Sequence, residues 1–136
     1  MTEIKKITKI ALLAYGIVNL IYGPISLFFP EFFIGLGVTT AETNPYALRF
    51  GGATLLGIAI FSILIALKKN WEWEKVKLAY VFLYYLLIAN IIIEPTKLLF
   101  GTPSVLMISQ TLMDIIIMVV LFILGVYSYI KQKKSA

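Results

Sequence analysis

The chain has 136 residues, of which 60% are hydrophobic and only 14% are charged, and its formal net charge is +5. A soluble domain carries about 45–50% apolar and about 25% charged residues, so the natural solvent of this chain is a lipid bilayer. The chain contains neither cysteine nor histidine, which excludes disulfides, thiolate metal sites, histidine-ligated haem and a Ser-His-Asp triad.

Four apolar segments are long enough to cross a membrane. A bilayer core about 30 Å thick needs roughly 20 residues of helix, and a helix satisfies its own backbone hydrogen bonds in lipid. The sequence therefore predicts an all-α fold, an integral membrane four-helix bundle, in a single domain over residues 1–136. The predicted helices are residues 7–29, 46–67, 78–94 and 105–130.

The first helix follows a lysine cluster and could be mistaken for a signal peptide. No small-x-small cleavage site follows its apolar run before the Phe28-Phe29-Pro30 stretch. We therefore interpret the segment as a retained transmembrane helix.

The loop after the first helix begins with an apolar piece, residues 31–38, that contains two glycines. These glycines argue against a stable buried helix, so we expect an interfacial or re-entrant segment. The polar stretch that follows, residues 39–44, is expected to be solvated. Asn44-Pro45 is a start signal for the second helix.

Lysine distribution predicts the orientation of the bundle. Three lysine clusters fall on one side of the membrane, whereas the opposite loops carry Glu31, Glu42 and a single lysine, Lys97. Because cytoplasmic loops are enriched in lysine and arginine, both termini are predicted to be cytoplasmic in a multi-pass protein of the cell membrane. The clustered residues are Lys5, Lys6, Lys9, Lys68, Lys69, Lys75, Lys77, Lys131, Lys133 and Lys134.

The same lysines account for the basic charge, so no nucleic-acid partner is expected. Trp71 and Trp73 lie in the loop between the second and third helices. They are either interfacial anchors or residues that pack this loop.

Small residues at four-residue spacing predict close helix packing in the membrane. In the second helix Ala53 with Gly57, and Ser62 with Ala66, have this spacing. In the first helix, Gly16 and Gly23 are expected to have the same effect.

Six polar residues inside the predicted helices are the candidate site residues, because such residues are costly in lipid. Arg49 and Glu94 lie at a similar level near the outer side, which predicts an ion pair. Asn19 and Asp114 both lie near the midplane, which predicts a hydrogen bond. Two further pairs have the i,i+4 spacing that places both members on one helix face. The six residues are Arg49, Glu94, Asp114, Asn19, Asn90 and Gln110.

Each candidate also has a structural interpretation. Arg49 could extend to the outer headgroups, and Glu94 could be an ordinary interfacial residue. Asp114 could be a hydrogen-bonded packing residue, and Asn19 could join two helices through a hydrogen bond. The sequence offers no metal-ligand cluster and leaves the cofactor unknown.

Residues 48–57 (LRFGGATLLG) and 15–30 (YGIVNLIYGPISLFFP) resemble elements of the DoxX-like small four-helix integral membrane proteins. This resemblance implies a four-helix bundle in the plasma membrane. Members of that group are linked to redox, quinone or sulfur metabolism, and many have no assigned function. The resemblance supplies no catalytic motif for these positions.

Three functions stay open at this point. The first is a small protein that binds a lipid-like or quinone-like molecule or acts as an accessory subunit of a membrane complex. The second is an oligomeric proton-coupled small-molecule transporter that uses Asp114. The third is an enzyme that acts on a lipid with Glu94 and Asp114 as acid and base; without histidine, cysteine or metal ligands, enzymatic activity is the least favoured.

Overall fold

The computed structural model describes residues 3–36, 44–69, 71–99 and 102–134. These residues form four long helices and two short helical elements, and the only bridge between extended segments in them is the isolated pair Glu3–Glu72. The predicted all-α fold with four membrane-length helices is therefore confirmed. The elements are α1 (Lys6–Phe28), α2 (Pro30–Gly35), α3 (Pro45–Leu67), α4 (Trp73–Ile93), η1 (Glu94–Leu99) and α5 (Val105–Lys133).

Local signals account for where the helices begin. The Asn44 side chain accepts a hydrogen bond from the Tyr46 amide at 2.9 Å, and Pro45 occupies the first helical turn, as the sequence predicts. Ser104 caps α5 in the same way, by accepting from the Met107 amide at 3.1 Å. The third long helix begins at Trp73 rather than at residue 78, because its first turn is amphipathic and not purely apolar.

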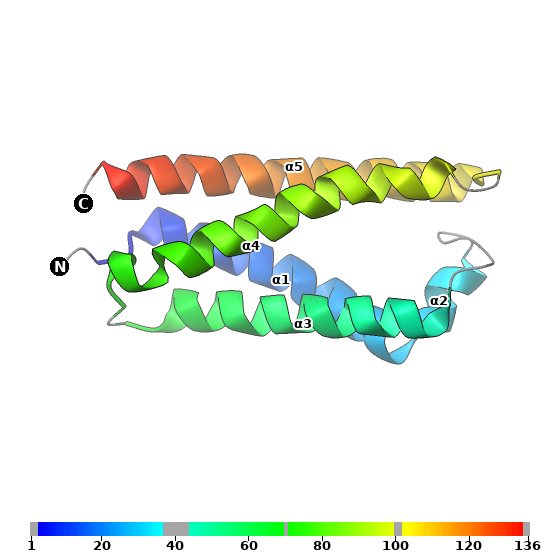
Figure 1. Cartoon of the computed structure of the whole chain (residues 1–136), viewed down its shortest axis with the longest axis horizontal. Coiled ribbons are helices and arrows are strands. Elements are labelled where there is room, and N and C mark those ends of the chain that lie inside the picture. Colours follow the sequence, from blue (N-terminus) through cyan, green and yellow to red (C-terminus); the bar gives the residue numbers. More distant parts are fainter. Residues whose placement is uncertain (1–2, 37–43, 70, 100–101, 135–136) are drawn as a thin grey trace.

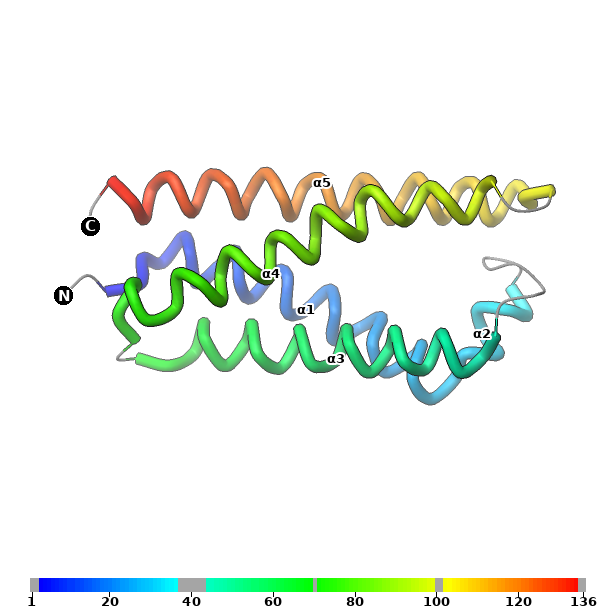
Figure 2. Tube along the Cα trace, in the orientation of Figure 1, coloured from blue at the N-terminus to red at the C-terminus, as the bar shows by residue number. Residues whose placement is uncertain are grey.

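Successive long helices run antiparallel to one another, so α1 and α4 share one direction and α3 and α5 the other (Figures 1 and 2). One end of the bundle, here called the termini end, carries both chain ends and the connection between α3 and α4. The opposite end, here called the far end, carries α2 and η1. All three lysine clusters thus lie at the termini end. α1 packs closely along α3, whereas α4 and α3 diverge from their connection towards the far end (Figure 1).

Glycines allow the close approach of α1 and α3. A Cβ atom at Gly23 would lie 2.9 Å from the Leu56 backbone nitrogen, and one at Gly16 would lie 3.2 Å from the Ala59 carbonyl oxygen. A Cβ atom at Gly52 would lie even closer to α1, 2.4 Å from the Leu27 backbone nitrogen. The predicted roles of Gly16 and Gly23 are confirmed. The Ala53–Gly57 prediction is wrong: Ala53 is exposed, and a Cβ at Gly57 would meet open space.

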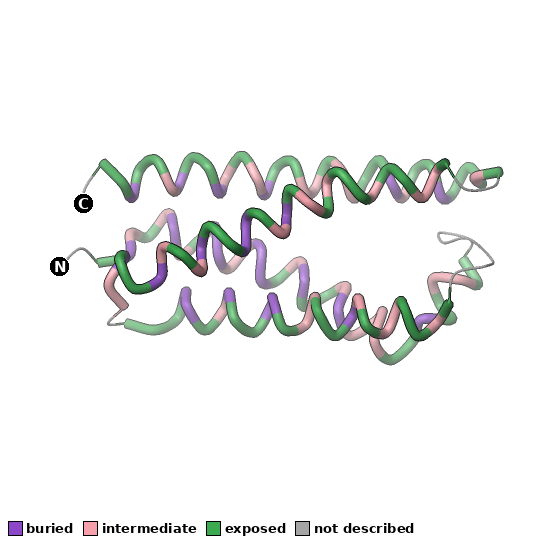
Figure 3. Tube along the Cα trace, in the orientation of Figure 1, coloured by how far each residue is buried: buried purple, intermediate pink, exposed green. Residues whose placement is uncertain are grey.

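The packed core lies mostly towards the termini end (Figure 3). There Trp73 is only 1% exposed and lies edge-on to Tyr80 and Tyr129, with ring centroids 5.5 and 5.7 Å away. For Trp73 the interfacial-anchor interpretation is wrong, because the helix starts early enough to turn the ring inward. Trp71 is half-buried, and the Lys68 ammonium lies 4.9 Å from its ring centroid.

The outer surface of the four long helices is apolar. All four are long and apolar enough to cross a membrane, and side chains such as Leu78 and Val105 are more than 80% exposed. A bilayer would cover this surface, as expected of a multi-pass membrane protein. The short helix α2 lies in the predicted apolar loop, with Phe32 exposed; residues 37–43, which include Glu42, lie outside the described residues.

Candidate functional site

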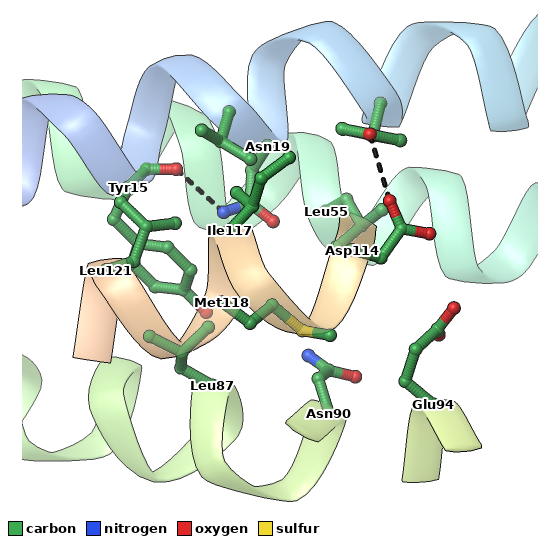
Figure 4. Close-up of a pocket in the computed structure, with 12 residues that line it drawn as sticks. Tyr15, Asn19, Leu55, Leu87, Asn90, Glu94, Asp114, Ile117, Met118 and Leu121 are labelled. Atoms are coloured by element: carbon green, nitrogen blue, oxygen red, sulfur yellow. Dashed lines mark hydrogen bonds between the residues drawn. The ribbon is translucent and has the colours of Figure 1, made fainter. Parts of the chain in front are cut away.

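A cavity of about 170 Å³ lies between the four long helices, on the far-end side of the packed core. Figure 4 shows its residues. Every long helix contributes to the walls, and η1 adds Glu94. The lining residues are Tyr15, Val18, Asn19, Tyr22, Leu55, Leu87, Asn90, Glu94, Asp114, Ile117, Met118 and Leu121.

Helical periodicity places the polar side chains in this cavity. On α1, Tyr15, Asn19 and Tyr22 follow one another at spacings of four and three residues, so they share a face. Asn90 and Glu94 share a face in the same way, as the sequence predicts. Of the six candidates, the lining includes Asn19, Asn90, Glu94 and Asp114. Gln110 contacts the site through Asp114, and Arg49 lies outside it.

Asp114 is the centre of the polar network. Its Oδ1 accepts hydrogen bonds from the Tyr22 hydroxyl at 3.1 Å and from Gln110 Nε2 at 2.8 Å (Figure 4 draws the first). The predicted Asn19–Asp114 bond is wrong. Asn19 instead donates from Nδ2 to the Tyr15 carbonyl oxygen at 2.7 Å, within its own helix. Tyr22 lies three residues closer to the far end than Asn19, and its longer side chain reaches the carboxylate.

Lys97 is a site residue that sequence reasoning missed. Its ammonium forms an ion pair with Glu94 Oε1 and lies 3.8 Å from Asp114 Oδ2. All three side chains are shielded, with exposed fractions of 25%, 26% and 19% for Lys97, Glu94 and Asp114. The i,i+3 spacing of Glu94 and Lys97 could have predicted their ion pair. This spacing brings two side chains together only in a helical segment, and the segment after α4 is helical in η1.

Arg49 does not pair with Glu94, so this predicted ion pair is also wrong. Its guanidinium lies 3.1 Å from Glu31 on α2, and both side chains are largely exposed, at 43% and 64%. Two structural features explain the change of partner. The helix α2 folds back beside the start of α3, and α3 diverges from α4 at this end (Figure 1). An exposed pair of this kind contributes little to stability.

The Tyr15 hydroxyl is the unsatisfied group of the site. Tyr15 is 2% exposed and lines the cavity, yet its hydroxyl has no hydrogen-bond partner among the described residues. A buried hydroxyl without a partner costs about 1–3 kcal/mol. The Tyr15 hydroxyl oxygen is enclosed by its neighbours, so a molecule in the cavity would recover this free energy once a small side-chain shift exposes the oxygen. Asn90, by contrast, is exposed at the rim of the cavity.

The described residues contain no group of three acidic, histidine or cysteine side chains that could hold a metal ion. The polar groups of the lining are two carboxylates, two tyrosine hydroxyls and two carboxamides, and the other lining side chains are apolar. This arrangement suits the binding of a small polar group with an apolar attachment.

Comparisons with protein families, with curated proteins and with solved structures find no match for this chain. The resemblance to DoxX-like proteins therefore stays a prediction. The fold and the site together define a multi-pass helical membrane protein with a partly polar cavity inside its bundle.

Proposed function

We propose that this protein binds the head group of an amphipathic, lipid-like or quinone-like molecule in the cavity between its four long helices. The observation that carries the proposal is the buried, unpartnered Tyr15 hydroxyl in a mainly apolar cavity with polar groups at one end. In the same proposal the protein lies in the cell membrane with both termini in the cytoplasm, and it acts alone, as a homo-oligomer or as an accessory subunit of a larger membrane complex.

The size of the cavity restricts the ligand. Its volume of about 170 Å³ is similar to the roughly 150 Å³ of an engineered cavity that holds one benzene molecule. One ring or one head group therefore fits, and a longer tail must lie outside. The lining includes Leu55 of α3 and Asn90 of α4, so in this proposal a tail leaves the cavity between these two helices and enters the lipid.

The transporter alternative requires access from both sides of the membrane. Towards the termini end, the interior is filled by large buried side chains, among them Leu12, Ile65, Tyr80 and Leu83. This packing supports a binding site more than a pathway in the present conformation. Transport of a small molecule that titrates with Asp114 would instead favour the transporter.

The experiment that tests the proposal is native mass spectrometry of the full chain released from lipid nanodiscs. The variants are Asp114→Asn, inside the cavity, and Glu31→Gln, outside it; each converts one carboxylate to an amide. We expect the wild type and Glu31→Gln to retain a lipid-like mass that Asp114→Asn loses. Equal retention by all three proteins, or no bound mass in any of them, would contradict the proposal. The same spectra report the oligomeric state.

A further inference from the structure

The two carboxyl side chains that line the cavity, Glu94 and Asp114, are its acidic groups, and the lining includes no lysine or arginine. Glu94 and Asp114 belong to the walls, whereas their counter-ion Lys97 does not. In Figure 4 the Glu94 carboxylate points towards Asp114 at the same end of the cavity. A molecule in the cavity thus meets carboxylate oxygens directly, whereas the Lys97 ammonium lies beside these carboxylates but outside the lining.

The charge of this cluster is not balanced by the protein. Glu94 and Asp114 carry two negative charges against the single positive charge of Lys97, which leaves a formal charge of −1. Arg49 is the other cation among the described residues of the far end, and its partner is Glu31. Charges in a shielded site interact far more strongly than in water, so the cavity favours a positively charged occupant.

Hydrogen-bonding capacity leads to the same conclusion. Among the described residues, the polar contact of Asp114 Oδ2 is Lys97 Nζ at 3.8 Å, which is too long for a hydrogen bond. Asn19 uses its amide nitrogen on the Tyr15 carbonyl oxygen, so its side-chain oxygen stays available as an acceptor. An ammonium group offers donors and no acceptor, so it matches these acceptor oxygens better than a quinone, whose oxygens only accept.

We propose that the ligand of this cavity is an amphipathic ammonium compound, an inference that rests on the proposed function and narrows its ligand class. The ammonium group lies against Glu94 and Asp114 on the cavity side, where it shares these carboxylates with the Lys97 ammonium. The tyrosine rings of the cavity add an attraction for a cation. The apolar part lies along Leu87, Met118 and Leu121 and leaves the bundle between α3 and α4.

Three probes with the same ten-carbon chain test the charge preference: decylammonium, decanol and decyl sulfate. Binding of each to the full chain is measured by titration in native mass spectrometry from a non-ionic detergent. We expect decylammonium to bind at least about tenfold more tightly than decanol, and decyl sulfate to bind most weakly. Glu94→Gln and Asp114→Asn should each weaken decylammonium binding about tenfold, and the control Glu31→Gln should not change it.

The variant Lys97→Met shows whether changes in decylammonium binding come from the charge of the site or from a misfolded protein. Removal of the competing cation should make decylammonium bind about tenfold more tightly, a gain that a damaged protein cannot produce. If decanol binds as well as decylammonium, or decyl sulfate binds best, the ammonium inference is overturned while cavity binding stands. If none of the three probes binds the wild type, the proposed function fails as well.

Discussion

Substitution of Tyr15 should change the stability of the protein and its binding of the ligand in opposite directions. Tyr15→Phe removes a buried hydroxyl that has no partner, so we expect the free energy of unfolding in detergent to rise by about 1 kcal/mol. Retention of the bound molecule should fall at the same time. The free energy of unfolding is measured on ligand-free protein by reversible denaturation, because a bound molecule would itself stabilise the fold, and retention is measured by native mass spectrometry on protein released from nanodiscs.

Tyr80→Phe provides the matched control. The Tyr80 hydroxyl donates to the Gly125 carbonyl oxygen at 2.9 Å and also contacts the Ser128 hydroxyl. Its removal should lower the free energy of unfolding by about 1 kcal/mol. If Tyr15→Phe destabilises the protein as much as Tyr80→Phe does, the Tyr15 hydroxyl has a partner that the structure does not show.

Residue positions could be predicted from the sequence, but residue partners could not. Helical rise and the i,i+4 rule place Asn90 beside Glu94 and Gln110 beside Asp114 correctly, because these relations lie within one helix. The partners of Asp114 and Arg49 depend on how the helices cross and on where α2 folds. No single-helix rule contains that information, so both cross-helix predictions were wrong.

At the scale of helices, the two adjacent glycines Gly51 and Gly52 of α3 differ in their contact with α1. A Cβ at Gly52 would meet the backbone of α1 near Leu27 and Gly23, which cannot move aside, whereas a Cβ at Gly51 would meet nothing within 4 Å. We expect Gly52→Ala to lower the free energy of unfolding by about 1–3 kcal/mol. Gly51→Ala should not lower it. Equal effects in thermal denaturation would show that the two helices are not in close contact.

The end of α5 holds the start of α1 through one buried side chain. Gln132 Oε1 accepts from the Lys5 amide at 2.7 Å and from the Thr8 hydroxyl at 3.1 Å, and Gln132 Nε2 donates to the Glu3 carbonyl oxygen at 2.9 Å. Gln132→Leu leaves these groups without partners, at a cost of about 1–3 kcal/mol. Hydrogen exchange should then quicken at the Lys5 amide. The exposed neighbour variant Lys133→Leu should leave this exchange rate unchanged.

At the scale of the molecule, apolar length alone predicted the number and approximate bounds of the long helices. Lipid requires continuous apolar helices of a fixed length, so this signal is strong. The cavity was harder to predict, because its lining combines side chains from all four long helices and η1 and so depends on how these elements pack together. The polar residues indicated where a site could lie, but not its volume or the Lys97 ion pair beside it.

The orientation of the molecule is a prediction that the absence of cysteine makes easy to test. The three lysine clusters gather at the termini end, and the positive-inside rule places that end in the cytoplasm. Single cysteines can replace the exposed residues Lys134, at the termini end, and Thr102, at the far end, without any background thiol. A membrane-impermeant maleimide should label Thr102→Cys in intact cells, and Lys134→Cys only after permeabilisation. The reverse pattern would invert the bundle, and the cavity would then face the cytoplasmic half of the bilayer.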